Sequence, residues 1–269
     1  MSIMKKATLL LLICISCLVC NAQEKPQANN RIADAANAIN PAARIHKFQL
    51  QPNYTVFHGG GQQLDLMTRI IMPFDGVYLP FIKTKNKDYF TMVRIEIPLI
   101  SQTYDSVSEK NATGLGDINI SEALAIKFSW GKIGFGPCIG IPTATNPVLG
   151  SGKWTAGLAA VAIYTKPKHV MLGVFMNQYF SYAGSPSRPA KNYMTVQPFI
   201  DFVFNKGYFI MINPIITFDW QNDNYTVPLA LGFGKAFAKN ISAYIMPEYI
   251  VSGPTNKSWA IQFNLNTMF

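Results

Sequence analysis

Cysteines, charges and histidines are all scarce in this chain of 269 residues. Only Cys138 lies beyond the first 20 residues, and a lone cysteine forms no disulfide within its own chain, so a disulfide-stapled domain is excluded. Charged residues make up 14% of the chain, and the net charge of +9 comes from lysines scattered over candidate turns. Such scatter favours contact with anionic lipid head groups over a nucleic-acid groove, and no nucleic-acid partner is expected.

Long hydrophobic runs are also missing after residue 22. No window there reaches the roughly 18 uninterrupted apolar residues of a membrane-spanning helix, so a helical membrane protein is excluded. Yet 49% of the residues are hydrophobic and 13% are aromatic. The placement of these apolar residues along the chain therefore decides the fold class.

The first 22 residues have the layout of a cleavable secretory signal peptide. Lys5 and Lys6 precede an apolar run over 7–19, and the small residues of 20–22 follow. A lipoprotein signal is the alternative, because Cys14, Cys17 and Cys20 are present. Ordinary cleavage is favoured, since Val19 before Cys20 is not a small residue.

The stretch 257–269 reads as a half-polar strand that ends on an aromatic residue. One set of alternate positions holds Trp259, Ile261, Phe263, Leu265 and Phe269, with Thr267 as the exception, and the other holds Ala260, Gln262, Asn264 and Asn266. Period-two alternation is the strand signal. Lipid-spanning strands have about 9–11 residues and carry apolar groups outward and polar groups inward. The stretch is typical of the closing strand of an outer-membrane barrel, and an edge strand of a soluble sandwich is the alternative.

The same alternation recurs from residue 46 onward and predicts twelve strands. Five lie in the first half of the chain, and Glu122 falls on the apolar side of one of them as an exception. The other seven are expected at 153–165, 169–183, 192–205, 208–221, 224–237, 241–251 and 257–269. Short turns alternate with the longer loops 101–116, 142–152, 183–191 and 252–257, as in outer-membrane barrels. The connections at 59–61 and 75–88 fit this alternation less well.

The fold class predicted is all-β, a transmembrane antiparallel β-barrel of about 12 strands over 46–269. An exported all-strand membrane protein must close into a barrel, because no backbone group can go unpaired in hydrocarbon. Segment 23–45 is either a periplasmic leader or a small plug, with a short helix at 31–39 that Pro41 would end. The tryptophans all fall near predicted strand ends, where the membrane interface favours them; they are Trp130, Trp154, Trp220 and Trp259.

This prediction places the protein in a bacterial outer membrane, with the membrane lipid as a partner. The barrel-assembly machinery is expected to recognise the C-terminal Phe269. No enzymatic activity is expected, because His46, His58 and His169 lie far apart near strand ends or turns and no stretch resembles a catalytic site. No cofactor or metal cluster is expected either.

Charges of both signs are predicted to face the lumen. These lumen-lining candidates are Asp65, Arg69, Arg94, Glu96, Lys127, Asp201, Asp219 and Glu248. They form either a salt-bridged network that fills a narrow barrel or a lining that selects a solute. Phe199, Phe209, Met211 and Tyr244 share the inward face, so the mixed lining suits an amphipathic or aromatic solute better than an ion.

The central stretch from Gly114 to Trp154 resembles a known family. It reads Gly114-Leu115-Gly116-Asp117, then Gly134 and Gly136, then Pro142-Thr143-Ala144-Thr145, then Leu149-Gly150-Ser151-Gly152-Lys153-Trp154. This is similar to the outer-membrane transporter family named for the meta-pathway of phenol degradation, which resembles the long-chain fatty acid and aromatic-hydrocarbon channels. The resemblance implies passive uptake of small hydrophobic or aromatic compounds. It carries over no binding residue, because the matching motif is mostly architectural.

Three functions follow from these patterns. The first is selective passage of a small hydrophobic or aromatic solute through a lumen too narrow for a bulk porin. The second is a non-transporting structural or surface-binding barrel, in which the inward charges form a salt-bridged network that stabilises the wall. The third, an enzyme, has the least support.

Overall fold

Every strand that the structure describes belongs to one antiparallel sheet. The computed structural model describes residues 31–75, 88–104 and 111–269. The predicted signal peptide 1–22 lies outside these residues, as does most of the connection 75–88. The strands are β1 (Lys47–Phe57), β2 (Gln62–Asp75), β3 (Tyr89–Tyr104), β4 (Asn111–Gly114), β5 (Ile118–Lys127), β6 (Gly131–Ile141), β7 (Lys153–Tyr164), β8 (Val170–Gly184), β9 (Asn192–Val203), β10 (Tyr208–Ile212), β11 (Ile216–Asp219), β12 (Asn224–Ala238), β13 (Ile241–Ser252) and β14 (Lys257–Met268).

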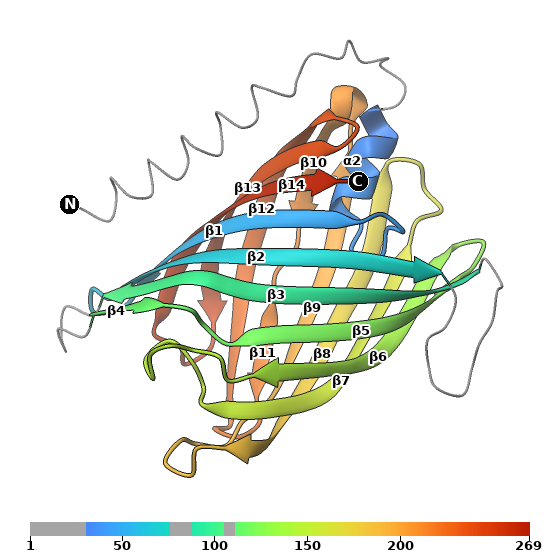
Figure 1. Ribbon diagram of the computed structural model, residues 1–269. Helices are drawn as coiled ribbons and strands as arrows, with labels where there is room; N and C mark the ends of the chain where they lie inside the picture. The colour runs from blue at the N-terminus through green and yellow to red at the C-terminus, as the bar shows by residue number, and fades with distance from the viewer. Residues whose placement is uncertain (1–30, 76–87, 105–110) are drawn as a thin grey trace.

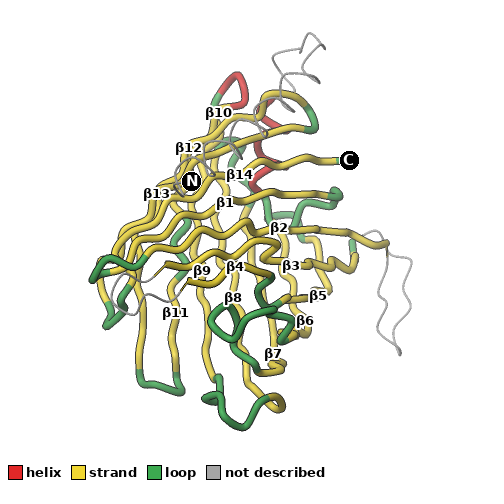
Figure 2. The backbone as a smooth tube through the Cα atoms, turned by 60° about the vertical axis from the view of Figure 1, so that its left-hand side comes forward, coloured by secondary structure: helices red, strands yellow, loops and turns green. Residues whose placement is uncertain are grey.

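The sheet closes on itself (Figures 1 and 2). Sequence neighbours pair antiparallel around the barrel, and β14 pairs with β1 in the register Leu50 with Leu265 and Tyr54 with Ile261. The barrel has twelve strands if β10 and β11 are counted as one, and β4 is an additional strand paired with β3. The prediction of a twelve-stranded antiparallel barrel is confirmed.

The predicted strand 208–221 is interrupted between β10 and β11. Ile212 pairs with Ile200 and Ile216 pairs with Val196, so Pro214 stands level with Pro198 on β9. Neither proline has an N–H to donate, and the ladder is lost there for that reason. The interruption matters for the lumen, because Asn213 lies within it.

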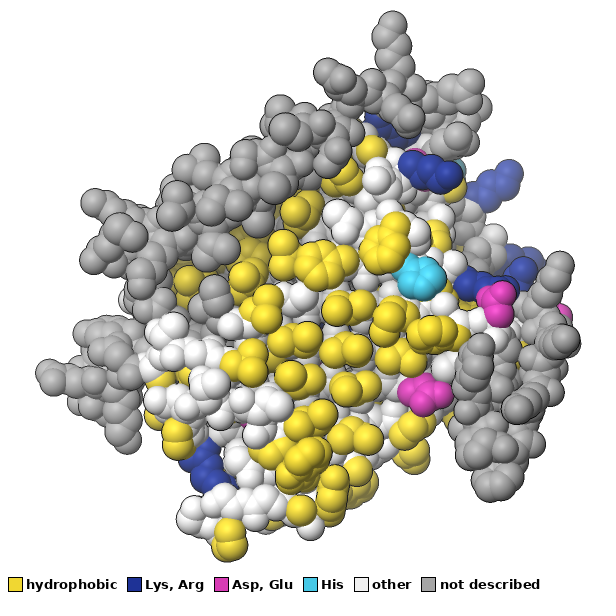
Figure 3. Space-filling model, viewed as in Figure 1, with side chains coloured by type: hydrophobic (Ala, Val, Ile, Leu, Met, Phe, Trp, Pro, Cys, Tyr) yellow, Lys and Arg dark blue, Asp and Glu magenta, His cyan; other side chains and the backbone are white. Residues whose placement is uncertain are grey.

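The outer surface of the barrel is an apolar band (Figure 3). On β14, Trp259 is 40% exposed whereas the alternate residues Ala260, Asn264 and Asn266 are buried, as the alternation predicts. Large exposed apolar side chains from other strands extend the band; examples are Phe135, Leu158, Phe180, Leu229, Phe233 and Tyr249. A surface of this kind is stable against hydrocarbon and not against water.

The two ends of the barrel differ in their connections. One end, called here the short-turn end, carries the tight connections 128–130, 165–169, 204–207 and 239–240, including the 3-10 turn η2 (Asn205–Gly207). The other, called the loop end, carries the loop 142–152. The predicted loop 101–116 is shorter than expected, because β3 runs to Tyr104 and β4 occupies 111–114. The alternation of apolar residues did not predict the end of β3 or the strand β4, because neither stretch alternates apolar with polar residues.

The helix α2 (Arg31–Ile39) occupies the short-turn end, beside η2 and close to the C-terminus (Figure 1). Its bounds are those predicted, and it ends two residues before Pro41. Ala35 and Ala38 are its buried residues, and Ala35 packs against Val203, Phe209 and Ala236 of the barrel wall. Across the described ranges, no helix has the length and apolarity needed to cross a membrane.

Candidate functional site: a lumen of three chambers

Three cavities follow one another along the lumen. The inner chamber, of about 110 Å³, lies against α2 and has Lys47, Arg69, Arg94 and Asp201 in its wall. The central chamber, of about 380 Å³, shares eight residues with it, and the outer chamber, of about 340 Å³, opens toward the loop end. The shared belt of the first two is Gln51, Arg69, Arg94, Phe175, Gln197, Ile215, Met246 and Gln262. Tyr193 and Asn119 line both the central and the outer chamber.

Two arginines meet one glutamate at the belt. Arg69 Nε donates to Glu96 Oε1 at 2.7 Å, and Arg94 donates to the same carboxylate oxygen. Arg69 also reaches the side-chain oxygens of Gln51 at 3.0 Å and Gln49 at 3.3 Å. The cluster arises because Arg69 and Glu96 are opposite each other in the β2–β3 register and Arg94 is two residues before Glu96. Local charge here is positive, since two guanidinium groups share one carboxylate.

Aromatic rings lie beside this cluster. The Arg94 guanidinium carbon is 5.2 Å from the ring centroid of Phe175. Tyr179 and Tyr193 stack with centroids 5.1 Å apart in the wall of the central chamber. The middle of the lumen therefore offers flat apolar surfaces within reach of fixed positive charge, an arrangement that cation–π contacts stabilise.

The inner chamber ends on the segment that contains α2. Lys47 is 1% exposed, and its Nζ donates to the carbonyl oxygens of Ala38 at 3.2 Å and Asn40 at 2.7 Å. A cation at the C-terminal end of a helix meets both the unpaired carbonyls and the negative end of the helix dipole. Lys132 Nζ donates to Ala42 O at 2.7 Å, and Asn266 Nδ2 donates to Ala38 O at 3.3 Å.

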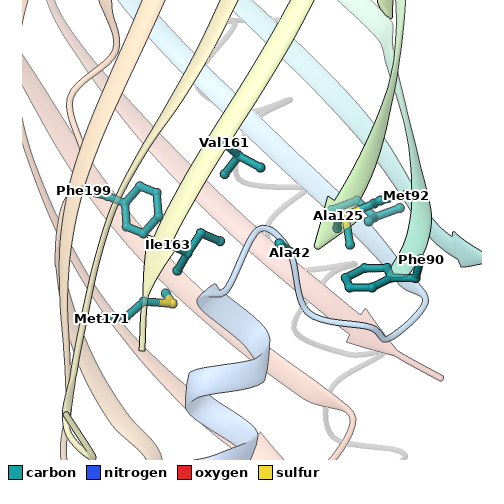
Figure 4. Packing of buried hydrophobic residues seen from close by; sticks show 9 residues of the cluster. Ala42, Phe90, Met92, Ala125, Val161, Ile163, Met171 and Phe199 are labelled. Carbon is teal, nitrogen blue, oxygen red and sulfur yellow. The ribbon is translucent and has the colours of Figure 1, made fainter. Parts of the chain in front are cut away.

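Apolar packing holds the same segment against the wall. Ala42, 2% exposed, lies among Phe90, Ile163, Met171 and other residues of a buried cluster, with the helix running below it (Figure 4). Arg31, at the start of α2, donates to the carbonyls of Ala236 and Phe237 on β12. The segment 31–45 is thus seated by side-chain donors at both ends and by apolar contacts between them.

Two charged side chains, Asp117 and Arg188, each bind the loop 142–152 at the loop end. Asp117 Oδ1 accepts from the backbone N–H of Ala144 at 3.1 Å, and its Oδ2 accepts from Ser151 N at 2.6 Å and Ser151 Oγ at 2.8 Å. Arg188 donates to the carbonyls of Pro147, Gly150 and Ser151. These contacts explain the Gly114–Trp154 pattern as a set of loop anchors.

Seven of the eight lumen-lining candidates line one of the chambers. Asp65, Arg69, Arg94, Glu96 and Glu248 line the central chamber, Asp201 the inner and Asp219 the outer. The eighth, Lys127, is exposed at the end of β5 and lines none of the three. Its position in the last residue of a strand explains the difference, because alternation carries little weight at strand ends.

Sequence reasoning missed several residues of the lumen. Lys47 shares the inward parity of Gln49 and Gln51, so extending the alternation by one step would have found it. Lys257 donates to Glu248 in the central chamber. It pairs with Phe57 next to a register shift between Val56 and Phe57, which the sequence pattern does not predict. The three histidines lie apart, and within the part of the chain that the structure describes no group of three metal-ligating side chains comes together.

Comparison with known proteins places the fold. No family model and no curated protein sequence matches the chain. Among solved structures, it is similar to an outer membrane channel from Pseudomonas putida F1, with a TM-score of 0.68 and 9% identity over 86% of this chain and 100% of that one. The NanC porin superposes with a TM-score of 0.53 and 11% identity, over 82% and 98% of the two chains.

The translocator domain of the autotransporter NalP from Neisseria meningitidis superposes with a TM-score of 0.50 and 10% identity, over 90% and 94% of the chains. The fold is therefore that of outer-membrane β-barrel channels and porins. The resemblance to the phenol meta-pathway family rests on the residues of 114–154 alone.

Proposed function

We propose that this protein is a narrow passive channel of a bacterial outer membrane for small hydrophobic or aromatic solutes, closed at its short-turn end by residues 31–45. The observation that carries the proposal is the row of three chambers from the loop end to α2. The chambers are too small for bulk diffusion, which matches a selective path. Export through the predicted signal peptide and a periplasmic position of the short-turn end belong to the same proposal.

The solute class follows from the wall of the central chamber. Phe175, Tyr179 and Tyr193 give flat surfaces for a ring, and Arg94 with Arg69 gives charge at the same level. A purely apolar compound would displace water from these guanidinium groups and leave the N–H donors that Glu96 does not use unpaired, which is costly in a confined space. A small aromatic body that carries polar groups fits both parts of the wall, in line with the resemblance of 114–154.

The test is solute flux into proteoliposomes with small aromatic probes and a sugar control. Two proteins are compared, the chain from residue 23 and a variant that lacks residues 24–44. Aromatic flux above sugar flux is expected in both, and it should rise several-fold on truncation, because the variant loses the helix that ends the inner chamber. A correctly folded barrel that passes none of the probes in either form would overturn the channel.

A second function, a non-transporting surface-binding barrel, is favoured by one observation. The loop 142–152 is bound so closely by Asp117 and Arg188 that it presents a fixed surface at the loop end. Absence of flux in both proteins, together with capture of a cell-surface glycan or protein by this loop, would support it.

Phe269 is the proposed contact with the barrel-assembly machinery. It is 76% exposed, its N–H donates to His46 O at 3.1 Å, and its ring stacks on the His46 ring at 5.7 Å. We expect Phe269→Ala to lower the amount of folded barrel in membranes, while Phe237→Ala, another exposed aromatic change on the outer wall, should lower it less.

A further inference from the structure

Three buried polar atoms with no hydrogen-bond partner among the described residues belong to side chains that line the inner chamber. They are Arg94 Nε, Asp201 Oδ1 and Asn213 Oδ1, and they come from β3, β9 and the interruption between β10 and β11. Nine such atoms exist in the described chain, so a third of them surround one cavity of about 110 Å³. Buried polar atoms are normally hydrogen-bonded, and a cluster of exceptions around a cavity indicates a ligand that supplies the partners.

Among the described residues, the carboxylate of Asp201 forms no ion pair with the other charged side chains of the inner chamber. It is 2% exposed, and its cross-strand neighbours on the two sides are Met171 on β8 and Met211 on β10. Its Oδ1 has no hydrogen-bond partner among the described residues. A buried carboxylate in apolar surroundings calls for a cationic or hydroxyl donor, because an unpaired buried charge is costly.

Arg94 provides the complementary group across the chamber. Its Nη2 donates to Glu96, while its Nε–H has no hydrogen-bond partner among the described residues. Lys47 and Arg69, the other cations of this wall, are already bonded to backbone carbonyls, to amide oxygens or to Glu96. The available donor is therefore a guanidinium N–H, which favours a carboxylate.

The remaining wall of the inner chamber is apolar or adaptable. Phe175, Phe199 and Met246 offer surface for a hydrocarbon body, and Phe175 and Met246 continue into the central chamber. The Asn213 amide can present its oxygen or its nitrogen, so it fits either end of a polar head group. A ligand can therefore place its polar head in the inner chamber and its ring in the central one.

The geometry points to a zwitterionic aromatic solute, of the class of an amino acid with an aromatic side chain, as the ligand of the inner chamber. Its carboxylate accepts from Arg94 Nε, its ammonium group donates to Asp201 Oδ1, and its ring lies along Phe175. This rests on the proposed function and narrows the solute class of the same lumen. A solute with only one of the two charges would leave one of the two side chains unsatisfied.

The experiment is calorimetric titration of the folded, detergent-solubilised chain with four probes. Phenylalanine carries both charges, 3-phenylpropionate only the acid, phenethylamine only the amine and 3-phenylpropanol neither. Phenylalanine is expected to bind at least about tenfold more tightly than each of the other three, since each lost charge-assisted hydrogen bond is worth that much or more. Four affinities within about twofold of one another would overturn the inference and would mean that water satisfies these atoms.

Two variants locate the two charges. Asp201→Asn should reduce phenylalanine affinity to about that of 3-phenylpropionate and leave the latter unchanged. Arg94→Lys keeps a cation beside Glu96 but removes Nε–H, so it should weaken both acids and spare phenethylamine. Glu122→Gln is the matched control, because it removes a carboxylate from the outward face of β5, and it should change none of the affinities. A uniform loss for all probes in Asp201→Asn would contradict the assignment.

Flux separates this inference from the proposed channel. Liposomes that pass all four probes without preference, from a chain that also binds them equally, would keep the channel and overturn the zwitterion site. Selective binding of phenylalanine without flux of any probe would keep the site and overturn the channel.

Discussion

The inner and outer ends of the lumen are each shaped by a segment that charged side chains hold through its backbone. At the inner end, Lys47 and Lys132 donate to carbonyls of residues 38–42. At the outer end, Asp117 accepts from N–H groups and Arg188 donates to carbonyls of the loop 142–152. Both ends therefore use charge-assisted bonds, which are stronger than neutral ones.

The two segments differ in how the chain ties them to the wall. The loop 142–152 joins β6 and β7, so the barrel fixes both of its ends. Among the described residues, the segment 31–46 continues into the wall only through β1, and its helix makes no pairing with the sheet. The same bonding chemistry thus gives a rim fixed at both ends of its chain at the outer end and, in the function proposed above, a removable closure at the inner end.

The Arg69–Glu96–Arg94 cluster lies between the two ends. Changes to it should lower the stability of the barrel without affecting the inner segment or the outer rim. Glu96→Ala leaves both Arg69 and Arg94 without their carboxylate partner, whereas Arg94→Ala leaves Glu96 bonded to Arg69. Removing the shared partner of a buried ion cluster costs about 3 kcal/mol, and water in the lumen lowers that figure. We expect a larger loss of unfolding free energy for Glu96→Ala than for Arg94→Ala, measured by urea titration in micelles. Equal small losses would mean that solvated side chains, rather than an ion network, line the belt.

Lys47→Met should unseat the inner closure and leave the outer rim intact. The methionine fills the volume, but the carbonyls of Ala38 and Asn40 lose their donor, at about 1–3 kcal/mol. Single-channel recording should then show open events about tenfold more often. Lys235→Met is the control, because this lysine is on β12 and contacts Tyr208 on the barrel wall. An unchanged record in Lys47→Met would show that apolar packing alone seats the segment.

Asp117→Asn should act on the outer rim alone. The amide keeps one acceptor and replaces the other with a donor that faces the N–H and hydroxyl of Ser151. A loss of about 1 kcal/mol follows for the loop. Limited proteolysis should cut 142–152 faster, while conductance stays the same. Cleavage at the original rate would mean that the hydrogen bonds of Arg188, rather than those of Asp117, hold the loop in place.

The smallest effect concerns pH at the inner end. Burial raises the pKa of Asp34 on α2 above its ordinary value, against the opposing charges of Arg31 and Lys239. The seated helix therefore holds this proton more tightly than the free segment does. Seating should strengthen as pH falls from above the raised pKa and should weaken as pH rises through that window. Open probability recorded over this range should lose part of its pH dependence in Asp34→Asn.

Much of the wall was predictable from residue order. The alternation on β14, from Trp259 to Asn266, gave the outward and inward faces, because a strand places successive side chains on opposite sides whatever surrounds it. The short helix at 31–39 was also predictable, from its composition and from Pro41. The split of 208–221 was not, since it depends on Pro214 meeting Pro198 on a neighbouring strand.

The sequence by itself determined that this protein is a closed antiparallel barrel with an apolar exterior and a mixed, charged interior. That much follows from period-two alternation and from the need to pair every backbone group in lipid. Only the tertiary structure decided which inward groups meet. Arg94 on β3 is far along the chain from Asp201 and Asn213, and closure of the barrel brings these three side chains around one chamber. Lys47 likewise gains its role only because α2 folds back over the end of its own strand.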